Sequence, residues 1–195
     1  MAPQDKQLDA LRREIDQIDA AMHDLLMKRV ALVGKVRGAK GPVAPLVYRP
    51  GREATVLRTL LARHHGPLPR GVVVRLWREI ISALVRLQGP FSIAVYAPKD
   101  DRRYVELAQD HFSRLAVVQP FGLIGPMIGA VGEGRAQVAV VPLGEDAAVE
   151  PWWLLCGGAG PRALHVLARL PYWPASEGAV AAPVAAVVGR QPFEA

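Results

Sequence analysis

The stretch VYRPGREATVLR, residues 47–58, gathers three ionisable side chains at what the sequence predicts to be a helix start. Pro50 and Gly51 stand immediately before the helical pattern, which is typical of such a start. Arg49, Arg52 and Glu53 then crowd a single turn. Two guanidiniums and a carboxylate in so little space need partners, so this turn is a candidate binding site.

A second set of polar side chains lies where apolar ones are expected. A heptad seam of apolar residues runs through the N-terminal part of the chain, and its continuation puts Arg29 at a core position. Lys40 follows eleven residues later, which is about 20° around an α-helix and about 16 Å along it. Gln88 lies on the apolar stripe of a later predicted helix. Two cations and an amide are therefore expected inside a helical core.

Arg29 has two interpretations. It can snorkel, or pair with a carboxylate such as Glu53 or Glu79. Taken together with Lys40 and Gln88, however, a core with cations and too few acids holds uncompensated charge, which costs on the order of several kcal/mol unless an anion fills the site. The simplest missing partner is a bound anionic ligand.

The element that must carry Arg29 and Lys40 is a long helix. Apolar residues in steps of three and four extend from about residue 5 to residue 40, where Gly41, Pro42 and Pro45 end the pattern. Such a helix is about 50 Å long, far more than the width of a compact unit of this size. Because it cannot bury its stripe within one chain, we predict an intertwined homodimer. The seam comprises Leu8, Leu11, Ile15, Ile18, Met22, Leu25, Leu32 and Val36.

Two shorter helices are predicted to complete an all-α domain over residues 1–89. One spans residues 51–64 and the other residues 69–88, where Pro90 stops it. Their inward positions are predicted to be Val56, Leu57, Leu60 and Leu61 in the first, and Val73, Trp77, Ile80, Ile81 and Leu84 in the second.

After Gly89 the pattern changes to short β-branched runs. Strands are predicted at 91–96, 115–119 and 137–142, with helices at 103–112 and 123–133 between them. This order indicates βαβαβ with a small parallel sheet, and two more strands are expected at 163–170 and 184–190. The fold class is therefore α+β overall, with a small α/β domain over residues 91–195.

Composition and charge narrow the range of possible functions. The chain is 51% apolar and 22% charged, as in folded proteins, and its formal net charge is +6. Residues 1–88 hold 16 Lys and Arg against 8 Asp and Glu, so an anionic partner is expected there. Nucleic acid is the weaker candidate, because the arginines lie partly in the seam and aromatic residues do not interleave with them.

The sequence also supports predictions about cellular location and cofactors. The N-terminus has neither an apolar core nor a cleavage site typical of a secretory signal, and no run of 18 uncharged apolar residues occurs, so a cytoplasmic protein without a membrane partner is expected. The single cysteine, Cys156, has no zinc-like spacing, and no metal or cofactor is predicted.

Three segments together resemble a known family. They are LDALRREIDQIDAAMHDLLMKRVALVGKVRGAK, YRPGREATVL and RLWREIISALVRLQ, and they cover residues 5–88 almost without gaps. The spaced LRxxIDxID, LLxxR and YRPxRE elements resemble the all-helical chorismate mutases, in the form often fused to prephenate dehydratase. The resemblance implies an isomerase that converts chorismate to prephenate in phenylalanine and tyrosine biosynthesis.

The resemblance also implies a role for each candidate side chain. Arg12 matches the arginine that the family donates across the dimer into the partner's site, and with Arg29 and Arg52 it would hold the two carboxylates of chorismate. Lys40 matches the lysine that contacts a carboxylate and the ether oxygen. Two polar groups complete the implied site, with Glu53 accepting the ring hydroxyl and Gln88 facing the ether oxygen.

Two positions depart from the family pattern. Arg49 stands where some members have an aspartate near the hydroxyl, and we expect it to be a rim charge rather than a direct ligand. Leu84 stands where many have a serine near a carboxylate. Losing that hydroxyl removes one hydrogen bond, about 0.5–1.5 kcal/mol, so weaker substrate binding is expected but not inactivity.

The second half weakly resembles one lobe of prephenate dehydratase, over roughly residues 91–145. The second lobe of that enzyme, with its Thr-Arg-Phe motif, has no counterpart, so neither dehydratase activity nor an amino-acid-binding regulatory module is predicted. Two alternatives to a mutase stay open. One is isochorismate pyruvate lyase on the same helical scaffold, and the other is a non-catalytic regulatory subunit of an aromatic-biosynthesis enzyme.

Overall fold

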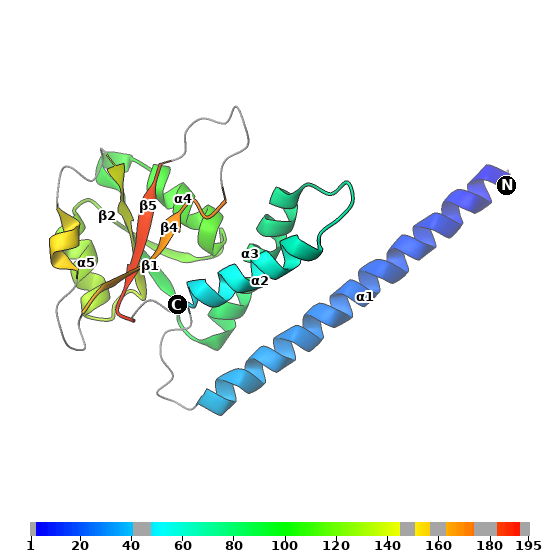
Figure 1. Ribbon diagram of the computed structural model, residues 1–195, viewed down its shortest axis with the longest axis horizontal. Helices are drawn as coiled ribbons and strands as arrows, with labels where there is room; N and C mark the ends of the chain where they lie inside the picture. The colour runs from blue at the N-terminus through cyan, green and yellow to red at the C-terminus, as the bar shows by residue number, and fades with distance from the viewer. Residues whose placement is uncertain (1–2, 41–47, 145–150, 157–162, 174–182, 192–195) are drawn as a thin grey trace. The chain divides into compact units, whose positions relative to one another are not determined.

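The computed structural model of the protein describes residues 3–40, 48–144, 151–156, 163–173 and 183–191 (Figure 1). The chain forms two compact units, Met1–Ala44 and Pro45–Ala195. The α+β fold class predicted from the sequence is confirmed, since the described part of the chain contains long helices and one five-stranded sheet.

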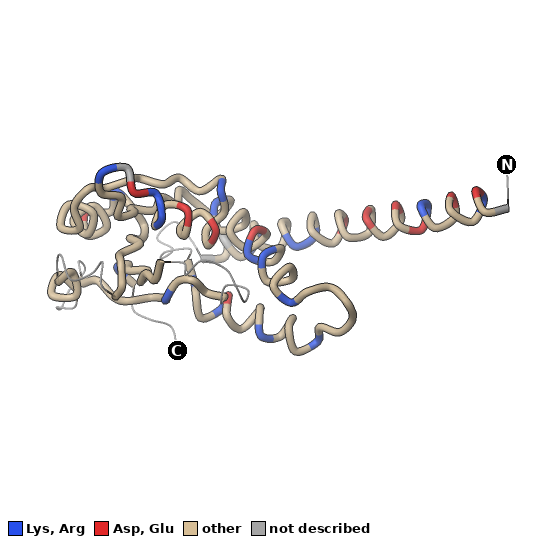
Figure 2. The backbone as a smooth tube through the Cα atoms, turned by 90° about the horizontal axis from the view of Figure 1, so that it is seen from above, with Lys and Arg blue, Asp and Glu red and all other residues tan. Residues whose placement is uncertain are grey.

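The first unit is one long helix, α1, which runs from Pro3 to Lys40 over 38 residues and confirms the helix predicted there. Its charge is unevenly distributed along its length (Figure 2). All six acidic residues lie between Asp5 and Asp24, together with Lys6, Arg12 and Arg13, whereas the five charged residues between Lys28 and Lys40 are all basic. Asp5 lies in the first turn, where negative charge interacts favourably with the helix dipole.

The predicted apolar seam of α1 is largely exposed. Leu11 is 52% exposed, Ile18 53%, Leu25 64% and Leu32 60%. A core residue normally loses nearly all of its accessible surface, which contributes about 1.5–3 kcal/mol for a large aliphatic side chain. The seam of α1 therefore lacks most of the stabilisation that its sequence pattern could supply.

The second unit begins with two helices, α2 (Pro50–Arg63) and α3 (Arg70–Gln88). Both agree with the predicted ranges within one residue at each end. A short turn joins them, in which Gly66 adopts a φ of +100° that favours glycine. Leu57 of α2 and the α3 residues Val73, Ile81 and Leu84 are buried as predicted. The other predicted inward residues are only half-buried, namely Val56, Leu60, Leu61, Trp77 and Ile80.

The rest of the second unit is a five-stranded sheet with helices. The strands are β1 (Ser92–Tyr96), β2 (Val117–Phe121), β3 (Val138–Pro142), β4 (His165–Leu170) and β5 (Ala185–Gly189). The helices are α4 (Arg103–Phe112) and α5 (Ile124–Gly132), with short 3₁₀ turns η1 (Pro98–Asp100) and η3 (Trp152–Leu155).

The strand order is β2-β1-β3-β5-β4. Strand β1 pairs in parallel with β2 and β3, as the βαβαβ pattern predicted. Strand β5, in contrast, is antiparallel to both β3 and β4, so the complete sheet is mixed. The sequence pattern identified the two later strands but carried no information on their direction.

The two faces of the sheet are covered by different helices. Ile93 and Val95 of β1 belong to a core that also contains residues of α4, whereas Ala94 belongs to a core with α5 and Trp152 of η3. This division follows from the two-residue period of a strand, in which successive side chains point to opposite faces.

Helix α3 belongs to the first of these cores. Ile81 and Val85 of α3, together with Tyr48 just before α2, cluster with strand residues and with Phe112 of α4. The compact unit therefore starts at residue 45 and includes α2 and α3 with the sheet. The domain boundary predicted at residues 89–91 coincides with the change from α3 to β1, and as a boundary between separate domains it stays a prediction.

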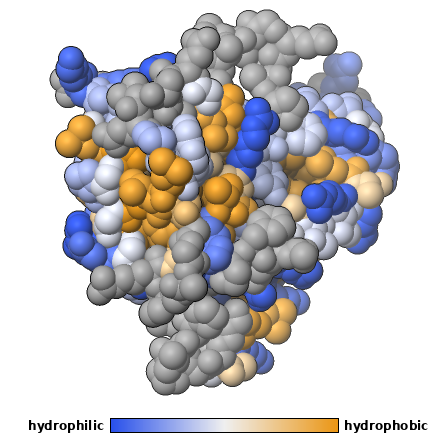
Figure 3. All heavy atoms as spheres, turned by 60° about the vertical axis from the view of Figure 1, so that its left-hand side comes forward, coloured by the Kyte–Doolittle hydropathy of each residue, from blue (hydrophilic) through white to orange (hydrophobic). Residues whose placement is uncertain are grey.

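Apolar side chains also reach the surface of the second unit (Figure 3). They include Leu115, Leu123, Trp153, Leu154 and Leu155, each more than half exposed. Over the residues that the structure describes, none of the helices combines the length and the apolar character needed to cross a membrane.

Candidate functional site

The start of α2 carries three of the predicted site residues. Pro50 occupies the first turn, and the backbone N–H of Glu53 donates to the carbonyl oxygen of Arg49 at 3.0 Å. A proline suits this position because its missing N–H would have no partner within the helix. An acidic residue in the first turn also interacts favourably with the helix dipole. The local sequence thus sets where α2 begins, and with it the positions of Arg49, Arg52 and Glu53 at the helix start.

Glu53 is buried beside Arg78 of α3. Its Oε2 lies 3.6 Å from Nη2 of Arg78, and each of the two side chains is 8% exposed. Burial raises the pKa of the Glu53 carboxyl to about 7, although the neighbouring Arg78 acts to lower it. The carboxyl therefore exchanges its proton near neutral pH, unlike an exposed glutamate.

Arg78 is held mainly by His111, in the last turn of α4. Its Nε and Nη2 donate to the backbone oxygen of His111 at 3.1 and 2.8 Å. Nη2 also lies 2.7 Å from Nε2 of the His111 ring. Because arginine can only donate, that ring nitrogen must accept, which leaves the proton of neutral His111 on Nδ1. The side chain of Arg78 is thereby fixed between two elements.

The environment of His111 supports its neutral form. Burial first, and the charge of Arg78 second, hold the pKa of His111 well below its usual range. The hydroxyl of Tyr48 lies 3.0 Å from the same Nε2 atom. Burial is also the main reason that the pKa of Tyr48 is raised, so its hydroxyl keeps its proton. We refer to Tyr48, Glu53, Arg78, His111 and Tyr172 as the buried polar cluster.

Tyr172, which follows β4, completes this cluster. Its ring lies under the guanidinium of Arg78, whose Cζ is 5.0 Å from the ring centroid. Its hydroxyl donates to the backbone oxygen of Pro50 at 3.2 Å. A cation over an aromatic face is stabilised by the ring quadrupole, and more so when water is excluded.

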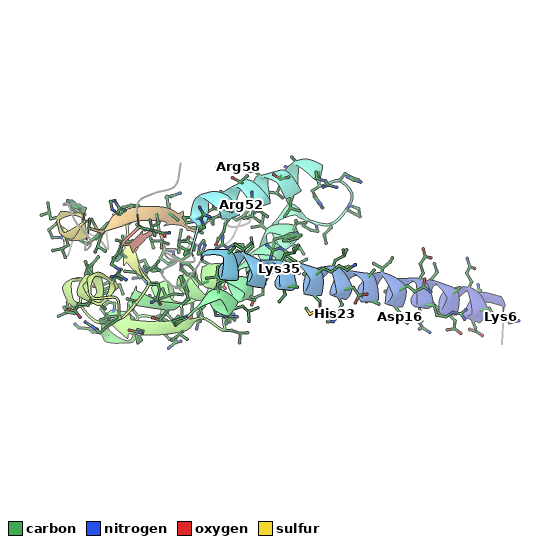
Figure 4. All side chains as sticks on the ribbon, turned by 90° about the horizontal axis from the view of Figure 1, so that it is seen from below. Lys6, Asp16, His23, Lys35, Arg52 and Arg58 are labelled. Carbon is green, nitrogen blue, oxygen red and sulfur yellow. The ribbon has the colours of Figure 1, made fainter. Side chains whose placement is uncertain are left out.

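The other predicted residues of the second unit lie around α2 and α3. Arg49 and Arg52 are exposed, and Arg52 projects from α2, which also carries the exposed Arg58 (Figure 4). Leu84 is buried, at 5% exposure. The side-chain nitrogen of Gln88, which is half-buried, donates to the backbone oxygen of Leu84 at 3.1 Å.

The predicted residues of α1 belong to the first unit. Arg12 is exposed, with Nη1 3.4 Å from Oδ1 of Asp9, and Arg29 is half-buried. The side chain of Lys40 lies outside the described residues. Convergence of these cations with Arg52, Glu53 and Gln88 on one ligand stays a prediction.

The two carboxylates named above as examples of possible partners for Arg29 have contacts within the second unit. Glu53 pairs with Arg78, and Oε1 of Glu79 accepts a hydrogen bond from the Ser113 hydroxyl at 2.6 Å. Where the chain is described, no three His, Cys, Asp or Glu side chains gather closely enough to hold a metal ion.

Two cavities flank Arg78 in the second unit. One, of about 350 Å³, is lined by Gly71, Val74, Arg75, Arg78, Leu107, Asp110, His111, Pro171, Tyr172 and Trp173. The other, of about 480 Å³, lies between α3 and α4 and shares Arg75, Arg78, Asp110 and His111 with the first. The surroundings of Arg78 thus include both buried polar contacts and open space.

Sequence reasoning missed Arg78, His111 and Tyr172. Arg78 did leave a signal, because it lies on the buried stripe of α3 at steps of four, three and four with Val74, Ile81 and Val85. An arginine at such a position calls for a partner, as Arg29 does in α1. His111 and Tyr172 left no comparable pattern, since their contacts with Arg78 and Pro50 span 33 and 122 residues of sequence.

Comparison with known proteins identifies the helical part of the chain. Residues 11–89 match the family model of chorismate mutase type II. The chain is 31% identical over 182 residues to the bifunctional chorismate mutase/prephenate dehydratase of Pseudomonas aeruginosa, which covers 86% of this chain and 49% of that protein. No solved structure matches the chain.

Two further relatives bear the same name. The protein of Stutzerimonas stutzeri is 33% identical over 142 residues, covering 70% of this chain and 39% of its own. That of Neisseria gonorrhoeae is 36% identical over 111 residues, covering 57% and 27%. The chain thus spans about half the length, or less, of the curated relatives it matches. Residues 11–89, which contain most of α1 and all of α2 and α3, thus carry the sequence of the chorismate mutase type II family.

Proposed function

We propose that the protein is a chorismate mutase, an isomerase that converts chorismate to prephenate by intramolecular rearrangement. One observation carries the proposal: the segment that matches the chorismate mutase type II family has six polar side chains at the positions where the resemblance places the contacts with the substrate. They are Arg12, Arg29, Lys40, Arg52, Glu53 and Gln88.

The chemistry suits these residue types. The rearrangement is pericyclic, so it requires no nucleophile and no proton transfer. The protein must hold a compact conformer of a dicarboxylate and stabilise the negative charge that develops on the ether oxygen. In the proposed site Arg12, Arg29 and Arg52 hold the carboxylates, while Lys40 and Gln88 face the ether oxygen. Fixed donors at a site of developing charge each contribute about 3–4 kcal/mol to the barrier reduction.

Glu53 takes the ring hydroxyl of the substrate in this proposal. Its ion pair with Arg78 involves one oxygen, Oε2. A carboxylate has about four acceptor positions, so this pairing leaves capacity for a substrate hydroxyl. Arg49 is placed at the rim, and Leu84 lines the site without a hydrogen bond to the substrate.

The proposed enzyme is a homodimer with sites shared between protomers. The support is the exposed seam of α1, in which eight large apolar residues are about half exposed or more. A second copy of α1 would cover such a seam by coiled-coil packing. Sedimentation of the intact protein tests this, with a dimer as the expected species and a monomer at micromolar concentration as the contradicting one.

The direct test is the loss of chorismate and the appearance of prephenate with purified intact protein. We expect turnover without added metal or cofactor, and a cytoplasmic location in cells. Isochorismate assayed in parallel distinguishes a pyruvate lyase, which would release pyruvate. Absence of turnover on both substrates would favour the non-catalytic regulatory subunit. Prephenate is expected to persist, because the proposal does not extend to dehydratase activity.

A further inference from the structure

The α/β part of the second unit holds the backbone at the start of α2 through hydrogen bonds and an aromatic contact. The Tyr172 hydroxyl, after β4, donates to the backbone oxygen of Pro50 at 3.2 Å. The side-chain nitrogen of Gln191, after β5, donates to the backbone oxygen of Tyr48. The Tyr48 ring lies edge-on to Phe112 of α4, with 5.1 Å between the ring centroids. Three separate segments of the second half thus hold the turn that carries Arg49, Arg52 and Glu53.

The side chain of Glu53 is fixed by the same part of the molecule. Its partner Arg78 makes two hydrogen bonds to the His111 backbone oxygen and lies over the Tyr172 ring. Buried charged hydrogen bonds are short-ranged and directional, so they define one position for the guanidinium. That position in turn defines where a negative carboxylate of Glu53 is most stable.

We propose that Arg78, His111 and Tyr172 are positioning residues, through which the C-terminal α/β part sets the location and the ionisation of Glu53 in the mutase site. This inference rests on the proposed function. The second half then supports the mutase site of the helical segment by positioning Glu53.

The charged and polar groups around Glu53 determine how the ionisation of its carboxyl changes with pH. Arg78 from α3 favours the carboxylate, whereas burial opposes it. The neighbouring groups from other elements are His111, held neutral, and the hydroxyls of Tyr48 and Tyr172, both with raised pKa values. Arg78 is therefore the principal group that keeps Glu53 able to accept a hydrogen bond near neutral pH, and its removal should raise the Glu53 pKa.

The experiment compares Arg78→Met, Arg78→Lys and Tyr172→Phe with the intact wild-type protein, and kcat/KM for chorismate is measured from pH 5 to 9. Arg75→Met is the matched control, because Arg75 lies one turn earlier on α3 and is exposed. We expect Arg78→Met to lower kcat/KM about 10- to 100-fold and to move its acidic limb to higher pH. Arg78→Lys should restore the limb, and Tyr172→Phe should lower kcat/KM about 5-fold.

A second readout does not depend on turnover. The Glu53 carboxyl is followed by ¹³C NMR during a pH titration and assigned with Glu53→Gln. We expect a wild-type pKa of about 7 that rises in Arg78→Met and is unchanged in Arg75→Met. A wild-type protein without mutase activity would end the proposed function, and the titration would still decide whether Arg78 controls Glu53.

Two results would overturn the inference. One is an Arg78→Met protein with the wild-type pH profile, whether its rate is unchanged or lowered equally at every pH, because a purely structural role predicts no displacement of the limb. The other is a Glu53 pKa that is the same with and without the Arg78 charge. If Arg78→Met does not fold, Tyr172→Phe carries the test, and a wild-type kcat/KM in that variant would also overturn the inference.

Discussion

The two compact units differ in how their charged side chains are paired. On α1 the pair Arg12–Asp9 is exposed on both sides, at 66% and 46%. In the second unit the pair Arg78–Glu53 is 8% exposed on both sides and has further hydrogen bonds and an aromatic ring around it. An exposed pair contributes about 0–1 kcal/mol, whereas breaking a buried one costs about 3–5 kcal/mol. The second unit supplies partners for its buried charges, whereas α1 in our proposal obtains its partners from a second molecule and a ligand.

The largest expected effect comes from disrupting the seam of α1. Ile18→Glu places a charge where the proposed dimer buries an apolar side chain in each copy. We expect the dimer dissociation constant to rise at least about 1000-fold and mutase activity to be lost with it. Gln17→Glu is the control, since it adds the same charge one position away and off the seam. A stable, active Ile18→Glu dimer would show that the seam of α1 is not the dimer contact.

The next largest effect is expected for a cation of α1 itself. Arg29→Ala removes one proposed carboxylate ligand, and we expect kcat/KM to fall about 100- to 1000-fold. Lys28→Ala, the neighbouring exposed cation, is the matched control and should stay within about 2-fold of wild type. If Arg29→Ala retains full activity, the site does not lie where the seam predicts.

The buried Arg78–Glu53 pair of the second unit should make the stability of the protein depend on pH. Glu53 has a folded pKa of about 7 against an ordinary value of 4.5, so the folded protein binds its proton more tightly than the unfolded chain. The contribution of Glu53 to stability is therefore greatest below pH 4.5 and is lost as the pH rises through 7, by about 3 kcal/mol.

Urea unfolding at a series of pH values measures this slope. Glu53→Gln should remove this contribution, whereas Glu106→Gln on the exposed face of α4 should not. Because the depressed pKa of His111 contributes a slope of the opposite sign, the test is the difference in unfolding free energy between wild type and Glu53→Gln, which should fall from pH 4.5 to 7. A difference that rises over this range would mean that the pair with Arg78 outweighs burial.

The smallest effect concerns Leu84, where many family members have a serine. Leu84→Ser supplies a hydroxyl near the proposed carboxylate, and Leu84→Ala removes the same side chain without adding one. Both should lower stability, because Leu84 is buried. The KM of the serine variant should be about 2- to 10-fold lower than that of the alanine variant, which corresponds to one hydrogen bond. Equal KM values would place position 84 away from the substrate.

Local periodicity was sufficient for most of the fold. The ranges of α2, α3 and α4 agree with the predicted helices within one residue. Four of the five strands lie within predicted segments, and β2 (Val117–Phe121) is shifted two residues beyond the predicted 115–119. These elements have strong local patterns with Pro and Gly at their ends. The antiparallel direction of β5 was not predictable in the same way, because it depends on pairing with β3 across more than 40 residues.

The candidate site was predictable only in part, for the same physical reason. The helix start at Pro50 and the cations of α1 follow from local sequence and from the resemblance to chorismate mutases. The contacts of Glu53 do not, since His111 and Tyr172 come from distant segments. Sequence alone therefore led to a proposal of which residues carry the chemistry, and the structure added what holds one of them, Glu53, in place.

A mixed dimer gives the most direct test of the central claim, that cations from two copies of α1 enclose one dicarboxylate. Arg12→Ala and Arg29→Ala chains with different tags are co-expressed, and the heterodimer is purified. If each site takes Arg12 from one protomer and Arg29 from the other, one of the two sites is intact. The account predicts about half of the wild-type rate of chorismate conversion, although each homodimer is nearly inactive. A heterodimer as inactive as both parents would contradict it.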